Sequence, residues 1–171
     1  PMNEESLAQA ENLKLICLTA TGTNNVDFAY ANKRGIAVAN VKGYSTQSVI
    51  QHTFALFFYL YEKLSYYDNF VKSGDYSRND IFCHFDAKFR ELYGKTWGII
   101  GLGEIGRGVA AIAKLFGCRV IYYSTSGKND NADYERVDFD TLLKESDVVS
   151  IHAPLNDATL NLIGAEELSK M

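Results

Sequence analysis

The sequence has few of the features that mark membrane, secreted or nucleic-acid-binding proteins. It has no long hydrophobic run: the most apolar stretch, residues 53–64, is too short to span a bilayer and ends in charged residues. Residues 1–12 are acidic and contain no apolar segment, so no signal peptide is expected there. The net charge is −4, and no basic run predicts nucleic-acid binding.

Cysteine is also scarce, with three residues in 171. Cys17 and Cys118 lie inside apolar runs, where cysteine packs as a small hydrophobic side chain. An odd number of widely spaced cysteines favours a reduced, cytoplasmic protein. Cys83 and His84 are adjacent, but two residues do not supply the three or four ligands of a metal site, so no metal is expected.

The first half of the chain predicts one β-α-β unit followed by a long helix. Residues 13–20 and 36–40 are typical of buried parallel strands, and residues 24–35 have helix start and stop signals. Residues 46–72 predict one long helix that is apolar almost all round and therefore buried. Residues 75–92 have no clean period and predict an irregular arm.

From residue 95 the pattern alternates regularly between strand and helix. The predicted strands are "TWGIIG", "RVIYYS" and "DVVSIHAP", and the predicted helices are 104–116, 138–146 and the segment that begins near 164. This alternation predicts an α/β fold with a doubly wound parallel sheet of the Rossmann type.

The stretch "GLGEIG" joins the first of these strands to its helix and has the spacing G-x-G-x-x-G at Gly101, Gly103 and Gly106. In this context the first glycine permits a tight turn and the second lets a pyrophosphate approach the backbone. The third lets the helix pack on the strand. The helix N-terminus offers N–H groups to the anion. The motif therefore predicts a dinucleotide site.

The next strand ends without the acidic residue that usually binds the adenosine ribose about 20 positions after the glycines. Ser124 stands at that position, followed by Thr125, Ser126 and the cation Lys128. Hydroxyls and a cation suit a 2′-phosphate, which tilts the prediction towards NADP. A plain polar loop is the alternative, so NAD and NADP both stay open.

Several blocks in order resemble D-2-hydroxyacid dehydrogenases, and most closely the glycerate dehydrogenase/hydroxypyruvate reductase branch. They are "TATGTNNVD", "GIAVAN", "GYSTQSVIQHT", "GKTWGIIGLGEIGR", "SDVVSIHAPLNDATLNLIG" and "LSKM". The resemblance implies an oxidoreductase that moves hydride between a nicotinamide dinucleotide and a small 2-keto or D-2-hydroxy acid. It also implies a homodimer.

The same resemblance divides the chain into three parts and implies that it is an internal fragment. Residues 1–44 would end a flavodoxin-like substrate domain, 45–92 would form a crossover helix and dimerisation arm, and 93–171 would begin the NAD(P)-binding domain. The family's catalytic Arg, Glu and His are expected beyond Met171. No residue here is therefore assigned a catalytic role, and the 171 residues alone are expected to be inactive.

The resemblance also implies binding residues. Thr21, Gly22 and Thr23 match a loop that touches the substrate carboxylate, with Thr21 also near the cofactor and Gly22 allowing the turn. The cofactor contacts would come from Gly101, Gly103, Glu104, Ile105, Gly106, Ser124, Thr125, Ser126, Lys128, Ala153, Pro154 and Thr159. His152 matches a cofactor-side position and not the catalytic acid, and His52 is expected to be a satisfied packing histidine.

Two other functions remain as alternatives. A non-enzymatic, dinucleotide-sensing interaction protein could use the same scaffold, because a fold does not fix a function. It would lack the Arg, Glu and His of the enzymes. A methyltransferase with a related glycine loop would bind S-adenosylmethionine instead, but the ordered blocks speak against it.

Overall fold

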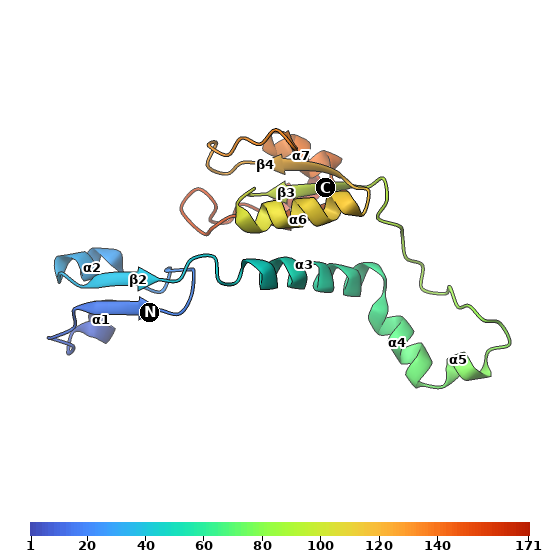
Figure 1. Ribbon diagram of the computed structural model, residues 1–171, viewed down its shortest axis with the longest axis horizontal. Coiled ribbons are helices and arrows are strands. Elements are labelled where there is room, and N and C mark those ends of the chain that lie inside the picture. Colours follow the sequence, from blue (N-terminus) through green and yellow to red (C-terminus); the bar gives the residue numbers. More distant parts are fainter.

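The computed structural model describes residues 1–171, whose strands form two separate parallel sheets (Figure 1). In the smaller sheet, β1 (Leu15–Leu18) pairs with β2 (Ala37–Asn40), and α2 (Phe28–Lys33) connects them. Asp27 begins α2 by accepting a hydrogen bond from the backbone N–H of Tyr30. The expected β-α-β unit is therefore present, and a short helix that was not expected, α1 (Glu4–Leu7), precedes it.

The larger sheet has the strand order β5-β4-β3-β6, and every pair in it is parallel. Its elements follow each other along the chain as predicted, apart from the extra two-residue strand β5. They are β3 (Thr96–Ile100), α6 (Glu104–Leu115), β4 (Arg119–Tyr123), β5 (Glu135–Arg136), α7 (Phe139–Glu145), β6 (Val148–Ile151) and α8 (Ala165–Ser169).

Helices cover both faces of this larger sheet, which is the doubly wound arrangement. On one face Trp97 and Ile99 of β3 pack in one cluster with residues of α3 and α6. On the other face Ile100 packs with Leu142 and Leu143 of α7. Because neighbouring residues of a strand point to opposite faces, a strand covered on both sides is apolar throughout. The predicted α/β fold class is confirmed.

The predicted single helix over 46–72 is wrong, because the structure breaks it into two. The first part is α3 (Thr46–Tyr61) and the second is α4 (Leu64–Lys72), followed by the single turn α5 (Asp75–Arg78). Lys63 lies between them with a φ of +55°, in the left-handed region. A left-handed residue ends a helix, but no glycine or proline marks this position in the sequence.

The helix α3 was also expected to be buried on all sides, and it is not. Only Ile50 and Phe54 are buried, while Leu56 and Leu60 are exposed. His52 is exposed too, so the expectation of a satisfied packing histidine is wrong. The buried side of α3 packs along α6 so closely that a Cβ on Gly108 would collide with the side chain of Ile50.

Cys17 likewise differs from expectation. It lies in β1, where buried and exposed residues alternate, and its side chain falls on the exposed face. Cys118 is buried, as predicted, and Cys83 is half-buried. The apolar run around Cys17 predicted a strand covered on both faces, whereas in this chain only one face of β1 is covered.

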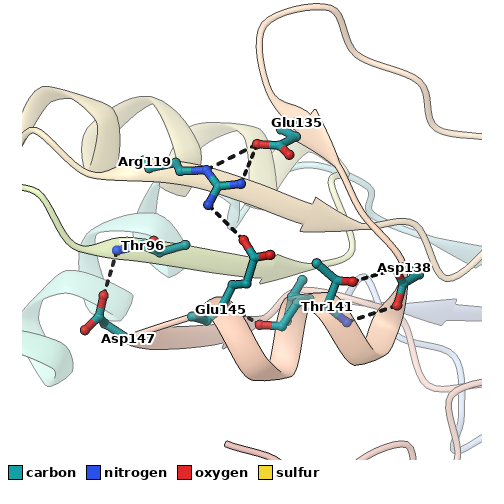
Figure 2. A network of polar contacts seen from close by, with 9 residues as sticks. Thr96, Arg119, Glu135, Asp138, Thr141, Glu145 and Asp147 are labelled. Atoms are coloured by element: carbon teal, nitrogen blue, oxygen red, sulfur yellow. Dashed lines mark hydrogen bonds and ion pairs between the residues drawn. The ribbon is translucent and has the colours of Figure 1, made fainter.

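Polar contacts hold the amino ends of the larger sheet's strands (Figure 2). Arg119 at the start of β4 bridges Glu135 at 2.8 Å and Glu145 at 2.8 Å. Asp147 accepts a 2.9 Å hydrogen bond from the backbone N–H of Thr96 and pairs with Lys95 at 3.0 Å. These contacts lie at the end of the sheet opposite the glycine turn, so they stabilise the fold away from the site. No helix of the chain is long and apolar enough to cross a bilayer.

Candidate functional site

The glycine turn between β3 and α6 has the geometry that its sequence predicts. Gly101 has a φ of +92°, and a Cβ there would lie 2.8 Å from the backbone nitrogen of Ala153. A Cβ on Gly106 would collide with the carbonyl oxygen of Gly101, so this glycine lets α6 pack against the turn. Both positions need glycine for reasons internal to the fold.

Gly103 differs from these two glycines, because a Cβ on it would meet no atom within 4 Å. It is the N-cap of α6, and no side chain caps the helix. The first N–H groups of α6 therefore remain available to a ligand, and they carry the positive end of the helix dipole. Open space beside an uncapped helix N-terminus fits a pyrophosphate.

Two cavities lie on either side of Gly103. The first, of about 220 Å³, is bounded by both structural units, since its lining includes Thr21 from the loop after β1 and Glu104 from α6. Its remaining lining residues are Gly43, Ser45, Thr46, Gly103, Ile105 and His152. The second, of about 280 Å³, is lined by Gly101, Gly103, Thr125, Ser126, Asn129, His152, Pro154, Asn156 and Ala158.

Gly103 and His152 line both cavities, so the two adjoin at the carboxyl ends of the strands. We call this pair of cavities the cleft. The Nε2 atom of His152 is buried and has no hydrogen-bond partner. Burial lowers the pKa of this imidazole, which keeps it neutral at pH 7. His152 therefore brings no resident positive charge to the cleft.

The predicted ribose loop borders the cleft only in part. Thr125 and Ser126 line its second cavity. Ser124 is only 4% exposed, and its hydroxyl accepts a 3.3 Å hydrogen bond from the backbone N–H of Asn129. Ser124 therefore shapes the loop from within, and Lys128 is an exposed residue outside the lining.

The sequence-based prediction did not include Arg136 of β5. Its guanidinium donates a 3.1 Å hydrogen bond to the carbonyl oxygen of Gly127, and no carboxylate pairs with it. This places a second cation beside the loop that contains Lys128. The sequence did not predict this contact, because β5 has only two residues and irregular residues separate it from the loop.

Of the other residues predicted to contact the ligands, some line the cleft and some do not. Thr21 lines it and donates a 3.0 Å hydrogen bond to the carbonyl oxygen of Val41, but Gly22 and Thr23 do not line it. Gly22 has no positive φ, so the expectation that the turn needs glycine there is wrong. Pro154 lines the cleft, and the Thr159 hydroxyl donates a 2.6 Å hydrogen bond to its carbonyl oxygen.

The sheet order, the glycine turn and the cleft at the strand ends together define a Rossmann-type α/β protein. Comparison with known proteins then identifies the family. Residues 54–171 match the family model "D-isomer specific 2-hydroxyacid dehydrogenase, NAD binding domain". The chain belongs to this family, which confirms the resemblance seen in its sequence.

A glycerate dehydrogenase from Methylorubrum extorquens is 39% identical to the chain over 171 residues. The match covers 100% of this chain and 53% of that protein, so the chain spans about half the length of this curated relative.

Solved structures agree. D-lactate dehydrogenase from Aquifex aeolicus, in complex with NAD and lactic acid, has a TM-score of 0.85 and 34% identity. The match covers 99% of this chain and 50% of that one. An acyclic imino acid reductase in complex with NADPH and D-Arg has a TM-score of 0.86 and 31% identity. The match covers 99% of this chain and 53% of that one.

Proposed function

We propose that the protein to which this chain belongs is a D-2-hydroxyacid dehydrogenase. It would transfer hydride between a nicotinamide dinucleotide and a small acid of the glycerate or hydroxypyruvate kind. The observation that carries the proposal is the cleft, whose first cavity is lined both by Thr21 and by the uncapped N-terminus of α6. The names of the relatives support the same reaction class.

The chain's own residues would bind and orient the two ligands. Gly103 and the first N–H groups of α6 would hold the pyrophosphate, with Thr125, Ser126 and Pro154 beside the adenosine half. Thr21 would lie at the substrate side of the cleft, together with its neighbours Gly22 and Thr23. When bound, the dinucleotide supplies or accepts the hydride. No residue of this chain is assigned the proton transfer or the positive charge that would hold the substrate carboxylate.

The proposed preference for NADP rests on the loop after β4. Lys128 and Arg136 are two cations on or beside this loop, and neither pairs with a carboxylate. Two free cations near the adenosine side support the lean towards NADP, because a 2′-phosphate adds negative charge there. One of the similar structures is a complex with NAD and the other a complex with NADPH.

The proposal includes a homodimer and a cytoplasmic location. The arm between α4 and β3 exposes large apolar side chains, with Phe82 at 90% and Phe85 at 66%. A patch of this kind commonly marks a protein–protein interface, so we assign the arm to contact with a second copy. The cysteines are free, as in a reducing compartment.

The test is hydroxypyruvate-dependent oxidation of NADH and of NADPH by the full-length protein, followed at 25 °C in parallel with direct binding of each cofactor. We expect turnover with both, faster with NADPH. Tight binding without turnover on any small 2-keto acid would favour the dinucleotide-sensing alternative. Binding of S-adenosylmethionine in place of either cofactor would overturn the proposal.

A matched variant links the activity to the cleft. In Gly103→Val the new Cβ meets no atom within 4 Å, and the φ of −78° there is one that side chains other than glycine adopt. We expect a normal melting temperature and a loss of cofactor affinity of at least about tenfold. Unchanged affinity would show that the cofactor binds elsewhere.

A further inference from the structure

The side chain of Glu104 is the feature of the cleft that the proposed function leaves unexplained. Glu104 is the first residue of α6; it lines the first cavity and is exposed. The oxygen Oε2 accepts a 3.3 Å hydrogen bond from the hydroxyl of Thr46, the first residue of α3. A Cβ on Gly43 would lie 3.6 Å from the same oxygen.

Nothing neutralises this carboxylate. Glu104 takes part in none of the ion pairs of the chain, and Arg107, one turn further along α6, instead donates a 3.3 Å hydrogen bond to the carbonyl oxygen of Leu102. A negative charge is therefore fixed beside the N–H groups that would receive the pyrophosphate.

Two helices begin at this point. The helices α3 and α6 pack along each other and start on the same side of the molecule, facing the smaller sheet (Figure 1). Neither has a side-chain cap, and both starts line the first cavity, through Ser45 and Thr46 of α3 and Gly103 and Glu104 of α6, so the positive ends of both dipoles face it. Glu104 is the acidic residue in the first turn of α6, and α3 has no acidic residue in its first turn.

We infer that Glu104 is an internal competitor of the dinucleotide, held in place by Thr46. Its carboxylate occupies the positive field of the two helix ends, and the anionic pyrophosphate must enter against this charge. Glu104 therefore weakens cofactor binding and sets the affinity at a level that permits exchange. This role rests on the proposed function, and it concerns the side chain, whereas the expected cofactor contact at this position is made by the backbone.

The test is the dissociation constant of NADH and NADPH, measured by calorimetry on the full-length protein and on Glu104→Gln. Glutamine keeps an oxygen that can accept from Thr46 and removes the charge. We expect binding about three- to tenfold tighter, because Glu104 directly follows Gly103, where the pyrophosphate is proposed to bind. The gain should shrink as ionic strength rises, since salt screens exposed charges.

Two further variants separate charge from structure. Glu91→Gln removes an unpaired, exposed carboxylate away from the cleft and should leave both dissociation constants unchanged. Thr46→Val removes the hydroxyl that holds Glu104 and should tighten binding less than Glu104→Gln does. Added to Glu104→Gln, it should change nothing further.

The outcomes are distinct. If Glu104 only stabilises the start of α6, Glu104→Gln will lower the melting temperature and leave affinity unchanged, which overturns the inference while the proposed function stands. Weaker binding by Glu104→Gln also overturns it. If neither protein binds either dinucleotide, both the inference and the proposed function fail.

Discussion

The two parallel sheets of this chain are built alike but are packed differently. In β3 every residue after Thr96 is buried, because α6 and α7 cover opposite faces of the sheet. In β1 only Ile16 and Leu18 are buried, and Leu15 and Cys17 are exposed. Within these 171 residues, the same strand-helix-strand pattern therefore has helices on both faces in one unit and a core on one face in the other.

This difference shows which unit can stabilise itself. The larger unit has a cluster of 12 buried residues on one face and a second cluster of 4 on the other, while the smaller unit has one cluster of 5. Since burial of apolar area is the main driving force of folding, we expect the larger unit to determine the stability of the chain.

The substitution with the greatest predicted loss of unfolding free energy lies in the core of the larger unit. Trp97 is 1% exposed, lies 5.1 Å from Phe54 between ring centroids, and donates a 2.8 Å hydrogen bond to the hydroxyl of Ser150. Trp97→Ala should cost about 3–5 kcal/mol of unfolding free energy. Ile36→Ala, in the smaller core, should cost about 2–4 kcal/mol.

Urea unfolding followed by circular dichroism measures both variants. If the units unfold separately, Ile36→Ala will shift only part of the transition, whereas Trp97→Ala will shift the greater part. Equal costs in a single transition would show that the two units are one cooperative core, contrary to this comparison.

A smaller effect compares two glycines, Gly106 in the first turn of α6 and Gly22 in the loop after β1. Gly106→Ala brings a methyl group against the carbonyl oxygen of Gly101 and should cost about 1–3 kcal/mol. Gly22→Ala meets only Asn24, at an ordinary 3.7 Å, and should cost less than about 0.5 kcal/mol. Thermal unfolding measures the pair, and a large cost at Gly22 would contradict the description of its loop.

A further small effect on stability is predicted at the amino end of β3, where Asp147 contacts the backbone N–H of Thr96. The backbone N–H of Thr96, and next the ammonium of Lys95, lower the pKa of Asp147. A carboxyl group with a lowered folded pKa stabilises the protein above its unfolded pKa of about 3.9 and loses that contribution as the pH falls through the folded value.

Asp147→Asn should therefore cost at most about 1 kcal/mol at pH 7, since the side chain is 41% exposed and partly screened. The difference from the original protein should vanish as the pH falls through the lowered pKa of Asp147. Stability measured from pH 7 to pH 2 tests this, and a difference that persists at pH 2 would assign the effect to packing instead.

Much of the fold could be predicted from the sequence, because each pattern used involves residues that lie close together in the chain. The glycine spacing, the strand before it and the helix after it predicted the turn that Gly101 and Gly106 form. The break at Lys63 was not readable, because a left-handed residue other than glycine depends on its surroundings and not on its own preference. The binding roles of the predicted site residues stay predictions.

The sequence by itself determined the order of the elements, the parallel sheets and the family, because periodicity, turn chemistry and motif spacing are properties of neighbouring residues. Which groups from separate segments come into contact depends on the tertiary structure. The contact of Glu104 with Thr46 joins residues 58 positions apart, and that of Arg136 with Gly127 joins two segments through a strand of two residues. Such contacts arise when packed helices and paired strands bring distant backbone together, and no local pattern encodes them.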